Sequence, residues 1–196
     1  MKVKVFFVLL AFMAKGTLSA FDSSDFQLIQ YGGKKVLAAK TQIVQKEYEN
    51  LMGENPSVIK NENLPVENVS WCDAIYFCNK LSEAHGLVPV YSVNGKTDAS
   101  LWNYTPHKRQ TIKGQIQLNE NADGYRLPSI EEWQQIGKEE KFWEWCYNLE
   151  YKDDGCFCNF SGNKFNCMMD SCYNFSSTRY YTITFRVVRS YNLPAD

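Results

Sequence analysis

The most informative segment of the chain is Gly124-Tyr125-Arg126-Leu127-Pro128-Ser129-Ile130-Glu131-Glu132-Trp133. It predicts an extended segment that ends where a short helix begins. Pro128 disfavours helical backbone angles at the residue before it, and Ser129 with Glu132 forms a Ser-x-x-Glu capping box. Trp133 then falls on the inward face of a helix that we expect over residues 129–136.

Upstream of this stretch, periodic patterns predict further elements. Residues 26–44 alternate loosely around a Gly-Gly turn and indicate a hairpin. Residues 44–52 predict a short helix with a glycine stop. A stronger helix is expected between a cap at Ser70 and a stop at Gly86, since its apolar residues recur at helical spacing. Residues 91–93 with the following Asn-Gly indicate a strand and a tight turn.

The rest of the chain shows little periodicity. Residues 97–121 are polar and irregular, and the chain from residue 138 onward suggests loops that close with a β-type run over residues 180–188. The predicted elements of the whole chain are a mixture of helices and strands. Since 44% hydrophobic residues in a chain of 196 suffice for a single core, we expect one α+β domain over residues 21–196. The formal charge of −1, without a basic block, gives no support for nucleic-acid binding.

Residues 1–20 have the layout of a secretory signal peptide. Two lysines precede an uninterrupted apolar run over residues 5–14, which is too short for a permanent anchor. Cleavage is expected after Ala20 or Gly16, and the alternative is a buried N-terminal element of the domain. We therefore expect an exported protein without an integral membrane anchor after cleavage, located in the periplasm, at the cell surface or outside the cell.

Five of the seven cysteines crowd into residues 146–172. In an oxidising compartment such crowding favours disulfides. The odd number leaves at least one thiol unpaired or bonded to another chain. We expect Cys72 and Cys78 to be buried packing residues, because residues six apart on a helix do not face each other. A four-cysteine metal site is the alternative for Cys156, Cys158, Cys167 and Cys172.

Five further segments form one ordered pattern with the opening stretch: Tyr48 with Met52-Gly53-Glu54-Asn55-Pro56-Ser57, the run from Leu64 to Ser82, the run from Gly86 to Tyr91, Trp143-Glu144-Trp145, and Phe185-Arg186-Val187-Val188. Over about residues 40–190 the pattern resembles the formylglycine-generating enzyme family of bacterial type, also called sulfatase-modifying factors. The resemblance implies a single domain with a C-type-lectin-like α+β fold and much irregular structure.

The resemblance also implies an activity and a cofactor. Active members of the family use O2 to convert a cysteine of a sulfatase polypeptide into formylglycine, and two of their own cysteines hold copper(I). The matching positions are Cys167 and Cys172, and thiolates are the soft ligands that select this ion. Asn163 and Lys164 replace a Gly and a Ser of the family's turn before them. The alternative is that both cysteines pack or form disulfides.

A calcium site near Trp143-Glu144-Trp145 is a further implication, with Glu144 as the ligand that this chain retains. The family's Asn at this site is Lys141 here, and an ammonium group cannot be an oxygen ligand. The several dozen residues that the family has between Trp133 and Trp143 are also reduced to nine. The chain is thus a shortened copy, in which we expect the family's activity to be weakened or lost.

Two function classes stay open, beside an inactive copy. One is a formylglycine-generating oxidoreductase that acts on a sulfatase-type polypeptide with copper and calcium. The other is a non-enzymatic, C-type-lectin-like binding protein of the cell envelope, which needs no cofactor and recognises a protein or carbohydrate. Tyrosine and asparagine suit adaptable recognition, and the expected surface consists of Tyr173, Asn174, Tyr180 and Tyr181.

Overall fold

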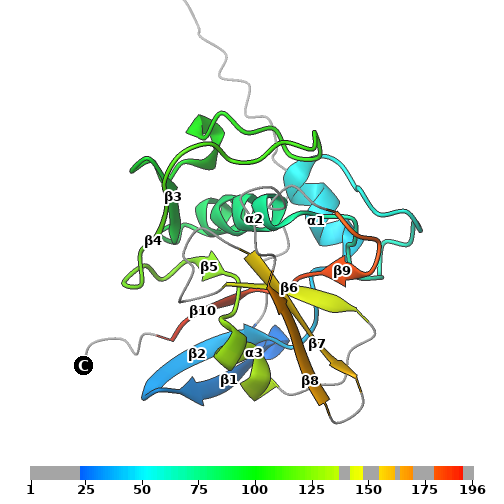
Figure 1. Cartoon of the computed structure of the whole chain (residues 1–196). Coiled ribbons are helices and arrows are strands. Elements are labelled where there is room, and N and C mark those ends of the chain that lie inside the picture. Colours follow the sequence, from blue (N-terminus) through cyan, green and yellow to red (C-terminus); the bar gives the residue numbers. More distant parts are fainter. Residues whose placement is uncertain (1–22, 137–141, 148–154, 162–163, 170–178, 192–196) are drawn as a thin grey trace, which may run out of the picture.

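A computed structural model describes residues 23–136, 142–147, 155–161, 164–169 and 179–191 of the chain (Figure 1). It contains three α-helices, two 3-10 helices and ten strands within these ranges. In chain order they are η1 (Ser23–Asp25), β1 (Phe26–Tyr31), β2 (Lys34–Ala39), α1 (Gln45–Met52), α2 (Trp71–Ala84), β3 (Tyr91–Val93), η2 (Ala99–Leu101), β4 (Ile116–Leu118), β5 (Tyr125–Arg126), α3 (Ile130–Ile136), β6 (Trp143–Tyr147), β7 (Gly155–Ser161), β8 (Lys164–Met169), β9 (Ile183–Thr184) and β10 (Val188–Ser190).

The predicted N-terminal hairpin is confirmed. Strands β1 and β2 pair antiparallel up to Tyr31 and Lys34, and both intervening glycines have positive φ, +56° at Gly32 and +77° at Gly33. A two-residue turn of this kind requires positive φ, which glycine adopts without strain. The hairpin belongs to the first of two four-stranded sheets, which has the order β1-β2-β10-β5. Strand β10, near the C-terminal end of the chain, therefore lies between the hairpin and β5 of the opening stretch.

The second sheet corrects the sequence prediction. The chain from residue 138 up to the expected β-type run was predicted to be loops, but β6, β7 and β8 pair antiparallel there. The β-type run expected over residues 180–188 contains β9, which lies parallel to β6, and the start of β10. Residues 144–147 of β6 are all buried. A strand buried on both faces lacks the polar–apolar alternation that reveals a strand. Residues 97–121 likewise contain β4, which pairs with β3 and, at three residues, is too short to show a period.

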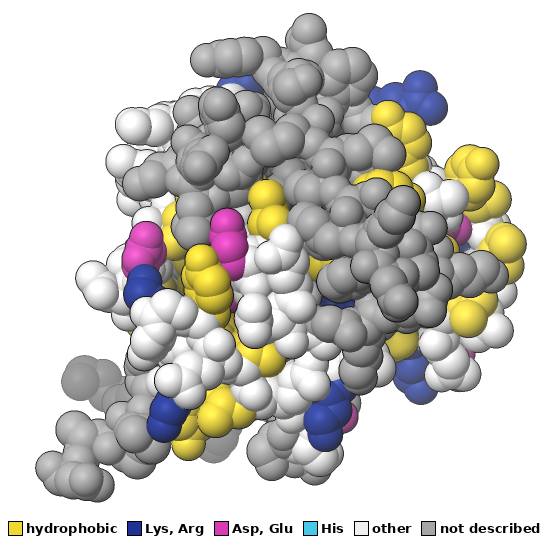
Figure 2. All heavy atoms as spheres, turned by 60° about the horizontal axis from the view of Figure 1, so that its bottom comes forward, with side chains coloured by type: hydrophobic (Ala, Val, Ile, Leu, Met, Phe, Trp, Pro, Cys, Tyr) yellow, Lys and Arg dark blue, Asp and Glu magenta, His cyan; other side chains and the backbone are white. Residues whose placement is uncertain are grey.

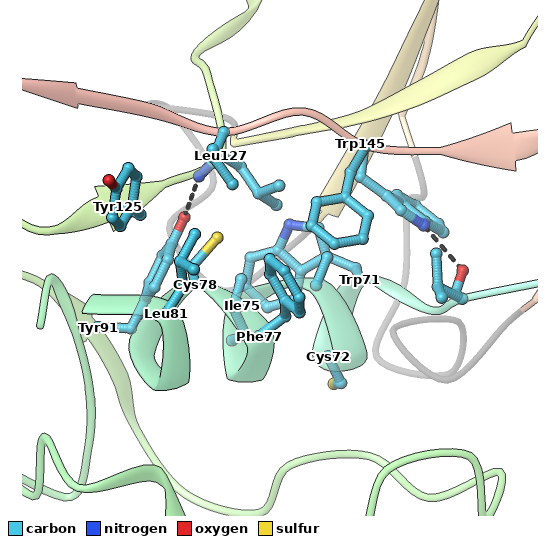
Figure 3. Close-up of a cluster of buried hydrophobic side chains, with 14 of the residues drawn as sticks. Trp71, Cys72, Ile75, Phe77, Cys78, Leu81, Tyr91, Tyr125, Leu127 and Trp145 are labelled. Atoms are coloured by element: carbon cyan, nitrogen blue, oxygen red, sulfur yellow. Dashed lines mark hydrogen bonds between the residues drawn. The ribbon is translucent and has the colours of Figure 1, made fainter. Parts of the chain in front are cut away.

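Helix α2 lies at the centre of the core, with strands on one side and loops on the other (Figure 3). The predicted cap is confirmed: the Ser70 hydroxyl accepts the Asp73 N–H at 3.1 Å, and Asp73 accepts the Ser70 N–H at 2.8 Å. Cys72 and Cys78 are buried thiols, as expected, and burial raises the pKa of Cys78. The largest fully buried side chains of the molecule include Trp71, Trp145, Tyr48, Tyr91, Phe77, Phe185, Ile75 and Leu127.

The opening stretch folds as predicted, into β5 followed by α3. The Ser129 hydroxyl accepts the Glu132 N–H at 3.1 Å, and Glu132 accepts the Ser129 N–H at 2.9 Å, which completes the capping box. Trp133 is only 2% exposed. A Cβ atom at Gly124 would lie 2.3 Å from the Val88 carbonyl oxygen, so the stretch must begin with glycine where the two backbones touch.

Within the described ranges, no helix has the length and apolar character needed to cross a membrane. Residues 1–20, the predicted signal peptide, lie outside these ranges.

Candidate functional site

The opening stretch also forms one wall of a cavity of about 490 Å³. The cavity lies where the β1–β2 hairpin, the loop after β4, the start of α3 and the ends of β6 and β10 meet. Acidic, basic and hydrophobic side chains are interspersed on the lower face of the molecule (Figure 2). The cavity is lined by Tyr31, Gly32, Lys34, Lys35, Val36, Leu118, Glu120, Asn121, Arg126, Ser129, Glu132, Tyr147, Ser190 and Tyr191.

An ion pair between Arg126 and Glu132 lines the cavity next to the start of α3. Two parallel hydrogen bonds join them, Nη1 to Oε2 at 2.6 Å and Nη2 to Oε1 at 2.7 Å. Burial alone would raise the pKa of Glu132, but the hydrogen bonds and charge of Arg126, with the Ser129 N–H, outweigh burial and lower it. The carboxylate therefore stays ionised and fixed, and the pair presents polar atoms with little net charge.

The rim of the cavity is more exposed. Lys34 forms an ion pair with Glu120 at 2.9 Å, and their side chains are 73% and 60% exposed. Tyr31 and Tyr191 are 42% and 36% exposed, while Tyr147 is buried. Aromatic faces beside paired charges are suited to non-covalent binding of a ligand with both apolar and polar parts. None of the lining residues is a cysteine or a histidine.

Glu144, the expected calcium ligand, lies in a closed ion pair away from this cavity. Arg186 donates to both of its carboxylate oxygens, from Nε at 2.6 Å and from Nη2 at 2.5 Å, and the Gln42 amide donates at 2.9 Å. Glu144 is 0% exposed. A guanidinium takes the place that a cation would need, so these residues do not fit calcium, and no step is derived through that ion. Lys141 lies outside the described residues.

The structure places the other predicted site residues only in part. Cys167 belongs to β8, whereas Cys172, the second expected copper ligand, lies outside the described residues, as do Tyr173 and Asn174. Tyr180 and Tyr181 are 43% and 70% exposed, and neither lines the cavity. Among the side chains that the structure describes, no group of three or more His, Cys, Asp or Glu is arranged to hold a metal.

A second polar cluster surrounds Asp73 at the start of α2. Besides its cap contacts, this fully buried carboxylate accepts the Tyr104 hydroxyl at 2.7 Å and the backbone N–H of His107 at 3.1 Å, and the Arg179 Nη2 atom lies 2.8 Å away. Burial lowers the pKa of His107 although Asp73 opposes the shift. The carboxylate is saturated with donors, so the cluster anchors loops to the helix rather than offering a site.

The roles of Arg126 and Arg186 in these ion pairs were not predicted from the sequence. Arg186 stands inside the apolar run Phe185-Arg186-Val187-Val188, and an arginine buried among apolar residues must have a partner. Arg126 stands six residues before Glu132, across the turn into α3. The arginine inside an apolar run was a signal that the sequence offered for a buried ion pair. The sequence offered no comparable signal for the cavity, because the cavity is assembled from separate segments of the chain.

Within the described residues, two four-stranded sheets, a two-stranded sheet and short helices pack with the central helix α2, joined by long irregular connections. This arrangement defines an α+β domain of C-type-lectin-like type. The chain belongs to the FGE-sulfatase family, since the model of the sulfatase-modifying factor enzyme 1-like domain matches residues 26–181. The fold class and the family expected from the sequence are thereby confirmed.

Two solved structures share the fold. Treponema denticola variable protein 1 superposes with a TM-score of 0.64 at 20% identity, over 80% of this chain and 84% of that chain. CarF superposes with a TM-score of 0.59 at 18% identity, over 86% of this chain and 97% of that chain. At these identities the likeness concerns the fold alone.

A curated relative is the chaperone protein LppX of Paenibacillus barcinonensis, 39% identical over 95 residues. The match covers 48% of this chain and 33% of LppX, so the chain spans about a third of that relative's length.

Proposed function

We propose that this chain is a non-enzymatic binding domain of the FGE-sulfatase family, which holds a segment of a partner polypeptide in the cavity beside the β1–β2 hairpin. The observation that carries the proposal is the cavity itself. Its volume of about 490 Å³ lies within the range of ligand sites, and it has aromatic, cationic, anionic and amide side chains within one opening.

The lining chemistry favours a polypeptide. The exposed faces of Tyr31 and Tyr191 offer apolar contact, while Lys34 and Glu120 can exchange their mutual ion pair for charges of either sign on a ligand. Tyrosine supplies large contact area at low entropy cost, and exposed ion pairs are weak enough to be exchanged. A peptide segment presents apolar, cationic and anionic groups together, which a site of mixed sign can match.

Two similarities support the same partner class. The family's activity is directed at a polypeptide, and a relative that shares 39% identity over 95 residues is named a chaperone protein. The lysines and the apolar run of residues 1–20 support export as part of the proposal. We place the binding domain in the periplasm, at the cell surface or outside the cell.

Binding of the full chain to a peptide array and a glycan array tests the proposal. We expect peptide hits, with affinity reduced about tenfold by Tyr31→Ala and by Tyr191→Ala, as for an aromatic interface anchor. Tyr181→Ala is the matched control, because Tyr181 is 70% exposed and lies outside the cavity. Binding lost in Tyr181→Ala alone would move the site to the Tyr180–Tyr181 surface, and hits on glycans alone would overturn the polypeptide partner.

The family's oxidation is the competing function, supported by the family match. It would require Cys167 and Cys172 as the thiol pair that holds copper. Incubation of the full chain with a Cys-x-Pro-x-Arg peptide, copper and O2, followed by mass spectrometry, tests it. We expect no formylglycine. Conversion that disappears in Cys167→Ser would contradict the non-enzymatic assignment.

A further inference from the structure

Strands β7 and β8 bring two cysteines to directly opposed positions. The pairing is antiparallel and continuous from Cys156 and Met169 to Ser161 and Lys164, and Cys158 is the partner of Cys167. The spacing of the cysteines along the chain does not identify this pair, because Cys156 lies only two residues from Cys158. The register of the two strands identifies it.

The parity of the ladder decides how close the Cβ atoms of opposed residues lie. Ser161 and Lys164 are partners with two residues between them, and a two-residue hairpin connection is flanked by a hydrogen-bonded pair. Hydrogen-bonded and non-hydrogen-bonded pairs alternate along an antiparallel ladder. Cys158 and Cys167 form the third pair inward from Ser161 and Lys164, so they are a non-hydrogen-bonded pair.

Non-hydrogen-bonded pairs are the closer ones. Their Cα atoms lie about 4.5 Å apart, and both this spacing and the roughly 5.5 Å of hydrogen-bonded pairs are allowed for a disulfide. The Cβ atoms decide between the two kinds of pair: a disulfide joins Cβ atoms about 3.5–4.5 Å apart, and only non-hydrogen-bonded pairs come as close as about 4.5 Å. The geometry points to a disulfide between Cys158 and Cys167 that joins β7 to β8.

The other opposed cysteines are placed less favourably. Cys146 on β6 is the partner of Cys156 on β7. A residue of a central strand directs both its N–H and its C=O toward the same neighbouring strand, so it forms a hydrogen-bonded pair with one neighbour and a non-hydrogen-bonded pair with the other. Since Cys156 forms a non-hydrogen-bonded pair with Met169 of β8, it forms the wider, hydrogen-bonded pair with Cys146. Cys146 is a buried thiol whose sulfur lies 3.7 Å from the Glu144 carbonyl oxygen.

The bond forms by thiol–disulfide exchange with a disulfide-bearing oxidant of an oxidising compartment. The thiolate of one cysteine attacks the oxidant and releases one thiol from it. The second thiolate then attacks the mixed disulfide and releases the other thiol. The two cysteines give up two electrons and two protons in all, and one disulfide of the oxidant becomes two thiols. Cys167 then has no thiolate for copper, whichever ligand the cavity binds.

Disulfide mapping of the full chain, folded with reduced and oxidised glutathione, tests the inference. Alkylation followed by cleavage after Phe157, after Phe160 and Phe165, and before Asp170 puts Cys156, Cys158, Cys167 and Cys172 on four separate fragments. We expect a linked fragment that contains Cys158 and Cys167 and disappears on reduction. A link from Cys167 to Cys172 or Cys156, or alkylation of both Cys158 and Cys167, would overturn it.

Single variants give a second readout. In Cys158→Ser, Cys167 becomes fully alkylated, and in Cys167→Ser, Cys158 does. Cys156→Ser is the matched control, two residues along the same strand, and leaves the link between Cys158 and Cys167 intact. Loss of that link in Cys156→Ser would also contradict the pairing. A failure of these tests would leave the proposal for the cavity untouched, because no cysteine lines it.

Discussion

Two bidentate Arg–Glu ion pairs differ in their burial and in the distance along the chain between their partners. Arg126 and Glu132 lie six residues apart, retain 16% and 9% of their side-chain exposure, and line the cavity. Arg186 and Glu144 lie 42 residues apart, at 1% and 0% exposure, and join β6 to the segment between β9 and β10. The same chemistry thus serves a local turn in one region and the closure of the core in the other.

The two pairs contribute to the fold in different ways. Glu132 also caps α3 by accepting the Ser129 N–H, so one carboxylate both pairs with Arg126 and stabilises the start of the helix. Both side chains of this pair keep some exposure to solvent. Arg186 also donates to the Ala39 and Lys40 carbonyl oxygens, at 3.3 and 3.4 Å, and so connects β2 to the second sheet. Because no water can replace a lost partner at full burial, the second pair should tolerate damage least.

The largest effect is therefore expected from Arg186→Met. The substitution leaves the Glu144 carboxylate buried without its cation, which costs about 3–5 kcal/mol in the free energy of unfolding. Urea denaturation at pH 7 measures the loss. The double variant Arg186→Met/Glu144→Met should recover most of it, since an apolar replacement of both partners removes the uncompensated charge. Equal losses in the single and double variants would show that packing, not the unpaired charge, dominates at this site.

Contacts between residues close in the sequence could be predicted from the sequence, whereas contacts between distant segments could not. The caps at Ser70 and Ser129 were predictable, because each involves a partner three residues away. The ion pair of Glu144 was not, since its partner comes from a segment brought close only by the pairing of β6 with β9. The resemblance led instead to a calcium ligand at Glu144, where the structure has a guanidinium.

The cavity and the cysteine pairing were beyond the sequence for a related reason. The cavity requires the hairpin turn at Gly32, the loop after β4 and the end of β10 to converge, and no periodicity describes that. The partner of Cys167 depends on strand register, which is fixed by pairing and not by spacing.

A smaller effect is expected from Glu132→Gln. Glutamine can still accept the Ser129 N–H as the third residue of a capping box, so the loss is that of the charged contact with Arg126, about 1–2 kcal/mol. Glu131→Gln is the control, with the same change of charge one residue earlier and an expected change within about 0.5 kcal/mol. Unfolding in urea measures both. Equal losses in the two variants would mean that helix charge in general, not the ion pair, stabilises the start of α3.

The smallest effect is the dependence of that loss on pH. The pKa of Glu132 is lowered in the folded protein, so its ionised form stabilises the fold above the unfolded-state pKa, about 4.3. The stability difference between wild type and Glu132→Gln should be full at pH 7 and should shrink as the pH falls below 4.3 through the lower, folded-state pKa. Urea midpoints between pH 3 and 7 measure it. A stability difference that stays constant to pH 3 would show that the loss comes from a changed geometry of the helix cap and not from the charge of Glu132. The ion pair that lines the cavity would then differ from the buried Arg186–Glu144 pair in stabilising the fold without an electrostatic contribution.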